Sequence, residues 1–369
     1  MAGWYNSVPD LSTSYAIIGS TSRIDIGATL LQALYDYAEI PTDHSVGPLG
    51  YPPDECEEIG GGESGVMFAL NNGSMAIKLA RDPSSSELWH GYNMSKHIFN
   101  IFTKYNITGV NLTGFKGYVS RDNPQFWTDT GLEEKARSIL EFPANALLTE
   151  RIPPVPISIQ HSLIHAFCDK RSKAQAMDNL VSDDCLVHLY FGSMNDKAQH
   201  SEDLSRHDFE LHLNHMLVLD LNKNFYFAIM RDMATALATM HWAARIDAKG
   251  VKFVLGGPRR SPIGMQTQEM APTRSSQVSV WMFDFEKTQS IPLSKEGVAK
   301  AVEAYMNNDP YCPRPFQGDD FGRYPWVIFE EAYLCTSRLI LHPYESYAQA
   351  FPSLFIKWVK VRERANRGL

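Results

Sequence analysis

Cysteine pairs, basic residues and long hydrophobic runs are all scarce in this sequence. Its 369 residues include five cysteines, which are scattered and form no C-x-x-C pair, so the sequence indicates neither a disulfide framework nor a zinc site. We expect these cysteines to be buried small hydrophobic residues, and we expect no metal centre. No stretch is long and apolar enough to cross a bilayer, and no basic segment followed by an apolar run opens the chain. We therefore expect a cytoplasmic protein without membrane contact.

The charge balance is acidic, with one basic exception. Lys and Arg number 34 against 42 Asp and Glu, a formal charge of −8, which argues against non-specific coating of nucleic acid because phosphate neutralisation needs an excess of cations. The C-terminal tail departs from this balance and interleaves Trp358 with its basic residues. That pattern is typical of a nucleic-acid contact, and a solvated helix end is the alternative. The basic residues of the tail are Lys357, Lys360, Arg362, Arg364 and Arg367.

The hydrophobic pattern indicates a large α+β chain in three segments. Residues 1–49 form an extension, and residues 50–150 are dominated by short strands. A proline-rich bend follows the apolar strand 146–150 and is typical of a hinge between lobes. Residues 151–369 are mainly helical, and their clearest helix is Asn224–Ala244, with apolar residues at helical spacing. Strands at Val251–Leu255 and Val280–Phe285 follow it.

A glycine-rich motif stands in the second segment. Gly60, Gly62 and Gly65 form G-x-G-x-x-G between strand-forming residues, and the turn Asn71–Gly73 leads to a strand that carries Lys78. Because the motif precedes a strand pair rather than a helix, it does not match the dinucleotide-binding fold. It matches the arrangement of protein kinases, in which the lysine reaches the ligand phosphates. A glycine-rich hairpin turn is the simpler alternative.

Other acids and one histidine complete the candidate site. Glu87 opens a predicted helix and is expected either to pair with Lys78, as a kinase glutamate does, or to face solvent. Asp247 and Asp284 each stand beside a strand, which predicts an acidic edge above a pocket. His241 ends the helix Asn224–Ala244, where a packed interior histidine and a catalytic one are both open.

In chain order, these parts resemble a protein kinase. The resemblance implies a protein-kinase-like bilobal fold of the α+β class, with a small β-rich N-lobe and a larger, mainly helical C-lobe. The details differ from a working kinase. Arg245–Lys249 replaces the H-R-D-L-K loop, Glu286 replaces the glycine of D-F-G, and Lys252 stands where a metal-binding asparagine is expected.

Several segments are similar to one fungal family of kinase-like domains. They are Asp184–Tyr190, Met233–Trp242, Ile246–Ala248, Phe253–Gly256, Asn308–Tyr311 and Pro313–Pro315, and the resemblance covers roughly residues 55–345. Single-domain members of that family include the arginine-containing cyclodipeptide synthases, which join arginine from arginyl-tRNA to a second amino acid as a diketopiperazine. That family usually has an acid where Lys252 stands.

The resemblance implies a tRNA-dependent cyclodipeptide synthase that needs no cofactor. Its partners would be arginyl-tRNA and either a second aminoacyl-tRNA or a free amino acid. The alternatives are a small-molecule phosphotransferase using ATP and magnesium, and a catalytically silent binding module. A covalent route through Cys185 is disfavoured by its apolar strand. The implied catalytic residues are Asp247, Asp284, Lys78 and His241. The residues implied to bind substrate are Glu150, Glu286, Glu87, Gly60, Gly62 and Gly65. The residues implied to bind tRNA are those of the basic tail, with Arg259 and Arg260.

Overall fold

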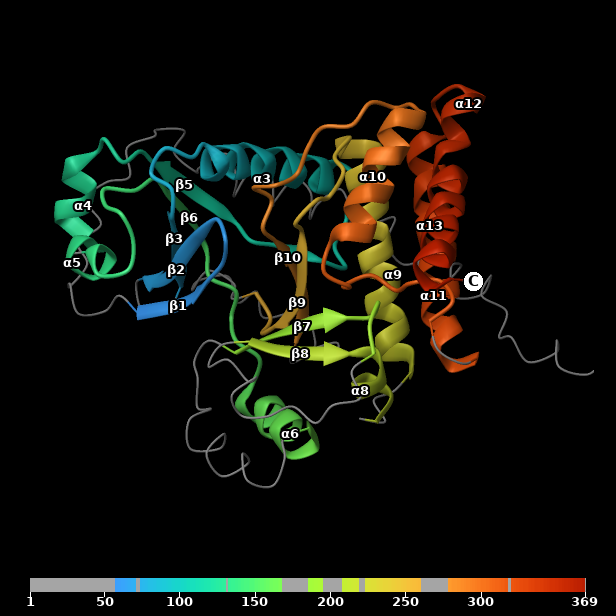
Figure 1. Ribbon diagram of the computed structural model, residues 1–369, viewed down its shortest axis with the longest axis horizontal. Helices are drawn as coiled ribbons and strands as arrows, with labels where there is room; N and C mark the ends of the chain where they lie inside the picture. The colour runs from blue at the N-terminus through green and yellow to red at the C-terminus, as the bar shows by residue number, and fades with distance from the viewer. Residues whose placement is uncertain are drawn as a thin grey trace, which may run out of the picture. The chain divides into compact units, whose positions relative to one another are not determined.

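The computed structural model describes most of the chain beyond the predicted extension. The described residues are 57–70, 74–130, 132–167, 185–194, 208–218, 223–259, 278–317 and 320–368. The predicted extension 1–49 and Arg260 lie outside them. The described residues form an α+β structure with two five-stranded sheets and several helices (Figure 1).

The first sheet is antiparallel, and its strands come from the segment before the predicted hinge. Its order is β1 (Glu57–Gly61), β2 (Gly65–Leu70), β3 (Met75–Ala80), β6 (Ala146–Glu150) and β5 (Phe115–Val119). The pairing of β2 with β3 confirms the predicted hairpin. Ile77 and Leu79 face a buried cluster that includes Trp127 of α4 (Pro124–Thr130) and Leu132 of α5 (Leu132–Arg137). Because side chains alternate along a strand, Lys78 faces the opposite side.

Helix α3 packs on that opposite side of the first sheet. It spans Glu87–Lys104 and buries Leu88 and Tyr92 against Leu147 of β6. The helix also reaches the second part of the molecule, because Ile98 and Phe102 belong to the larger hydrophobic core. Helix α3 therefore contacts both regions and stands beside the space between the two sheets (Figure 1).

The second sheet combines strands from distant parts of the sequence. Its order is β4 (Asn111–Leu112), β10 (Ser279–Phe283), β9 (Lys252–Gly256), β7 (Leu186–Tyr190) and β8 (Asp208–His212). Strands β9 and β10 pair antiparallel, with Lys252 opposite Phe283, whereas β7 and β8 pair in parallel. Both predicted strands, Val251–Leu255 and Val280–Phe285, are confirmed within a residue or two. Because β4 precedes the predicted hinge, this sheet draws on both sides of it.

Helices bury the core that supports the second sheet. The predicted helix Asn224–Ala244 is confirmed as α9 (Lys223–Thr239), which continues into a π-helical turn at Met240–Ala244. Helix α9 packs against α11 (Asp320–Leu341), and α10 (Lys295–Asn307) packs against α13 (Phe351–Arg367). The other helices in the described part of the chain are α6 (Ile157–Phe167), α8 (Leu213–Val218) and α12 (Ser346–Gln349). Among the described helices, none combines the length and apolar character needed to span a membrane.

Candidate functional site

A pocket of about 560 Å³ has a lining drawn from both sheets. The first sheet contributes the glycine-rich segment 60–65 and Lys78, and the second contributes Lys252 and Asp284. Glu150, at the end of β6, also lines it. The strands thus bring residues separated by about 200 positions in the sequence into one cavity, which is the size of a small-molecule site.

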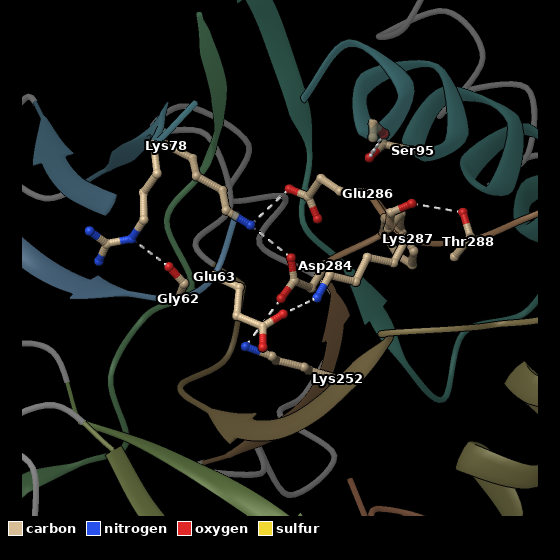
Figure 2. A network of polar contacts seen from close by, with 12 residues as sticks. Gly62, Glu63, Lys78, Ser95, Lys252, Asp284, Glu286, Lys287 and Thr288 are labelled. Carbon is tan, nitrogen blue, oxygen red and sulfur yellow. Dashed lines mark hydrogen bonds and ion pairs between the residues drawn. The ribbon is translucent and has the colours of Figure 1, made fainter. Parts of the chain in front are cut away.

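Lysines engage both carboxylate oxygens of Asp284 (Figure 2). The Nζ atom of Lys78 lies 2.8 Å from one oxygen, and the Nζ atom of Lys252 lies 3.1 Å from the other. Lys78 also donates to Glu286 at 3.0 Å. A further ion pair, between Lys287 and Glu63, links the second sheet region to the glycine-rich segment. The pocket therefore contains alternating positive and negative groups rather than a wall of free acids.

The local backbone explains why the glutamate in this network is Glu286. Asp284 adopts a φ of 73°, in the left-handed region that non-glycine residues seldom adopt. Gly91 of α3 lets Glu286 approach, because a Cβ atom there would lie 2.7 Å from its Cγ. Of the two alternatives for Glu87, the solvent-facing one is confirmed, since Lys78 binds Asp284 and Glu286 while Glu87 is exposed at the start of α3.

Burial and charge together set the protonation of this network. Burial raises the pKa of Glu286 to about 7, opposed by the charge of Lys78 and reinforced by a hydrogen bond with Asp284. For Asp284, burial is outweighed by that hydrogen bond and by the charges of Lys78 and Lys252, which hold its pKa below the usual range. The two acids hold the pKa of Lys78 above its usual range despite burial. At neutral pH, Glu286 is therefore the group that exchanges a proton.

The three glycines of the G-x-G-x-x-G motif differ in how closely other atoms approach them. A Cβ atom at Gly65 would lie 2.5 Å from the carbonyl oxygen of Leu79, so a side chain would force β2 and β3 apart. A Cβ atom at Gly60 or Gly62 would meet no atom of the described chain within 4 Å. The turn is closed by the N–H of Gly62, which donates to the carbonyl of Gly65 at 2.9 Å. All three motif glycines line the pocket, and packing of β2 against β3 requires the last of them to be a glycine.

Asp247 lies outside the pocket that contains Asp284. Its side chain is buried, and one oxygen accepts from the backbone N–H groups of Lys249 at 3.0 Å and Gln289 at 2.9 Å. Burial raises its pKa despite these hydrogen bonds. Asp247 instead lines a separate cavity of about 20 Å³. The structure does not bring the two aspartates together in one pocket as the sequence predicted. Asp247 instead accepts hydrogen bonds from the backbone.

His241 is an interior histidine. It is fully buried, and its Nδ1 lies 2.8 Å from the hydroxyl of Tyr333. The rings of Trp242 and Phe355 pack around it. Burial lowers its pKa to about 3, so the ring is neutral. The predicted catalytic role is not supported by this position, because His241 lines the small cavity with Asp247 and is not part of the lining of the larger pocket.

Glu150 already binds a guanidinium group that belongs to the chain. The Nε atom of Arg259 lies 3.1 Å from one oxygen of Glu150, and a terminal nitrogen lies 2.9 Å from the other. The guanidinium also lies 5.1 Å from the ring centre of Trp281. Arg259, predicted to contact tRNA, is therefore engaged at the pocket edge. The forked geometry is the one that a carboxylate uses to select arginine.

The basic tail forms much of α13 and is partly committed to internal pairs. Lys360 lies 2.7 Å from Glu330, and Arg367 lies 2.6 Å from Glu363. The exposed remainder of the basic set is Lys357, Arg362 and Arg364. None of the five is part of the pocket lining among the described residues. Helix α13 packs against α10 and α11, at the end of the molecule that Figure 1 shows on the right.

Several residues that line the pocket were not among those predicted from the sequence. His188 of β7 donates or accepts a hydrogen bond at 2.7 Å with the hydroxyl of Tyr311, and both residues line the cavity with Asp208 of β8. The buried strand around His188 was predicted, but nothing in its sequence indicated which sheet face would be open. Cys185, just before this strand, is buried, and burial raises the pKa of its thiol to about 12, which leaves it a poor nucleophile.

The family described as DUF3669, zinc finger protein, matches residues 280–345, a stretch that contains Asp284 and Glu286. Curated proteins and solved structures gave no match. Within the described residues, no group of three or more His, Cys, Asp or Glu side chains is placed to hold a metal ion. Cys312 and Cys335, both in the matched stretch, are free thiols.

Proposed function

We propose that the chain is a tRNA-dependent cyclodipeptide synthase built on a kinase-like bilobal fold. It would join arginine, delivered as arginyl-tRNA, to a second amino acid and release a diketopiperazine. The fold proposal is supported by the five-stranded sheet with α3 beside it, and by a pocket whose lining comes from two sheets. The observation that carries the activity is the engagement of Asp284 by two lysines beside a glutamate with a pKa of about 7.

This network disfavours phosphoryl transfer of the kinase type. Such transfer uses magnesium ions held by carboxylates next to the phosphates. A magnesium ion binds carboxylate oxygen at about 2.0–2.1 Å, and both oxygens of Asp284 are already in contact with ammonium groups of Lys78 and Lys252. The ion would have to displace a lysine and tolerate its charge. Asp247, the expected base, is bound to backbone N–H groups and is not part of the pocket lining.

Aminolysis of an ester suits the same groups better. The ester bond of an aminoacyl-tRNA already stores the energy, so the protein needs to position the reactants, accept a proton from the attacking amine and stabilise the oxyanion. Ionised Glu286, with a pKa near neutrality, is buried and is not itself part of the pocket lining. The amine proton would therefore reach it by way of Lys78, which lies 3.0 Å away, lines the pocket and would donate to the carbonyl oxygen. The balance requires the second amino acid to arrive as an ester of tRNA as well: the first attack forms one C–N bond and breaks the C–O bond to one tRNA, and ring closure forms the second C–N bond and breaks the C–O bond to the other tRNA. Each released hydroxyl oxygen takes up a proton.

The direct test is product formation from defined components. Purified protein would be incubated with arginine, the other amino acids, total tRNA, synthetases and ATP, and products would be analysed by mass spectrometry. Arginine-containing diketopiperazines that vanish after RNase treatment are expected. Glu286→Gln should reduce the rate by about 100-fold or more, whereas Glu134→Gln, on the exposed side of α5, should not. Absence of any RNase-sensitive product would refute the proposal.

A catalytically silent binding module is the second candidate. It is favoured by one observation, the use of Asp247 to bind backbone rather than substrate. Such a module would keep a pocket without turnover. In this case total tRNA would raise the melting temperature of the protein in a concentration-dependent manner, while the assay above gave no product.

A further inference from the structure

A row of polar side chains leads away from the pocket along one face of the second sheet. Strands β7 and β8 run parallel in a fixed register, and alternate residues share a face. The paired residues on this face are Leu186 with Asp208, His188 with Glu210, and Tyr190 with His212. The first members, Leu186, Asp208 and His188, line the pocket. His212 therefore stands one step, about 7 Å, beyond Glu210 on β8 and diagonally across from His188 on the same surface.

A serine, a histidine and a glutamate meet at the end of this row. The Oγ atom of Ser193 lies 2.6 Å from Nδ1 of His212, and Nε2 of His212 lies 3.4 Å from a carboxylate oxygen of Glu210. The backbone holds the pair together, because the N–H of Leu213 donates to the carbonyl of Ser193 at 3.1 Å. A hydroxyl in contact with a base that is oriented by an acid is the arrangement that activates a nucleophile.

The hydrogen bonds fit one protonation state. If the hydroxyl of Ser193 donates to Nδ1, the neutral ring of His212 carries its proton on Nε2, where it faces Glu210. The neighbouring His212 lowers the pKa of Glu210, so the carboxylate is ionised. At 3.4 Å from Nε2 it makes no hydrogen bond in this structure and favours that ring orientation through its charge. Its side chain is 54 % exposed, whereas that of His212 is 10 % exposed. His212 is thus buried and held by the structure, whereas Glu210 beside it is exposed to solvent.

We propose that Ser193 is a nucleophile that accepts the acyl group of an activated carboxylic ester, with His212 as its base and Glu210 as the orienting acid. The Oγ atom attacks the carbonyl carbon and its proton passes to Nδ1 of His212. The C–O bond to the leaving alcohol then breaks, and that oxygen takes the proton back from His212. The products are an ester on Ser193 and a free alcohol. The identity of the acyl group as an amino acid rests on the proposed function; the nucleophile itself does not.

The first experiment uses a fluorophosphonate probe, which forms a covalent adduct with activated serines. The full chain would be labelled and digested, and the modified peptide would be identified by mass spectrometry. One adduct on Ser193 is expected. It should be lost in Ser193→Ala and slowed by about 100-fold or more in His212→Gln. Ser138→Ala, which removes an exposed hydroxyl on the first sheet's side of the molecule, is the matched control and should label normally.

Folding and acyl transfer are then checked separately. Each variant's melting temperature is measured, and Glu210→Gln serves as the milder variant, with slower labelling in a folded protein. Radiolabelled arginyl-tRNA is next mixed with excess protein, quenched and treated with RNase. Radioactivity retained on the wild type and lost in Ser193→Ala supports an acyl-enzyme. Absence of an adduct on Ser193, or unchanged labelling in folded His212→Gln, overturns the inference even if diketopiperazine forms. An adduct without diketopiperazine overturns only the proposed function.

Discussion

Replacing Lys252 by asparagine should turn the pocket into a divalent-cation site. Lys252 places a positive charge 3.1 Å from Asp284. Unit charges at that distance attract by about 5 kcal/mol at an effective dielectric constant of about 20, and by about 1 kcal/mol in water. Because the lysine side chain is 32 % exposed, solvent screening reduces the attraction to about 1–2 kcal/mol. The same charge repels an incoming cation, so its removal should strengthen divalent binding about tenfold or more.

The assay is calorimetric titration with Mn²⁺ at pH 8, where Glu286 is ionised. Lys252→Asn should bind the ion about tenfold more tightly than the wild type does, since about 1.4 kcal/mol corresponds to a factor of ten. Adding Asp284→Asn to that variant should remove the gain. Lys300→Asn is the control, because it removes a lysine from a surface pair on α10. Equal Mn²⁺ affinity in wild type and Lys252→Asn would refute the idea that the positive charge of Lys252 keeps a divalent cation away from Asp284.

Three further predictions concern the same pocket. Glu286 has a pKa raised from 4.5 to about 7, so its contribution to the free energy of unfolding is complete below pH 4.5 and is lost as pH rises towards 7. Glu286→Gln should remove about 3 kcal/mol of that pH dependence. The measurement is urea unfolding at pH 5 and pH 8. Gly91→Ala should lower the free energy of unfolding by about 1–3 kcal/mol, because its Cβ would meet Glu286 at 2.7 Å; Asn93→Ala on the same helix should cost less. Arg259→Ala should free Glu150 and strengthen arginine binding in the pocket, measured by calorimetry, and unchanged affinity would contradict that role.

The sequence predicts well those features that depend on local pattern. The turn Asn71–Gly73 between two alternating runs predicts a hairpin, and β2 and β3 pair as expected. The lysine of that hairpin and Asp284 after β10 both reach the pocket. Helix α9 follows from its apolar spacing. In each case the information lies within about 20 residues, which is the range over which periodicity specifies an element.

The errors concern residues whose environment is set by tertiary contacts. Asp247 stands beside a predicted strand just as Asp284 does, but its neighbours include the N–H of Gln289, 42 positions away. His241 ends a helix and could have faced a pocket, yet Tyr333 and Phe355 enclose it. For Glu87 the sequence left pairing and exposure open, because it could not show that the glutamate partner of Lys78 comes from a different element. No local pattern distinguishes an acid that binds backbone from one that lines a cavity.

The altered residues of the pocket are consistent with a single change in charge balance. Lys78 and Lys252 bring two positive charges to Asp284, which supplies only one negative charge. Glu286 provides the second acid, and Gly91 provides the space for it. With Glu286 protonated, the group of four carries a net charge of +1; with Glu286 ionised, it is neutral. Because that proton is exchanged near pH 7, the network can accept one proton without burying an unpaired negative charge, which is what attack of an amine on an ester requires as the amine loses its proton.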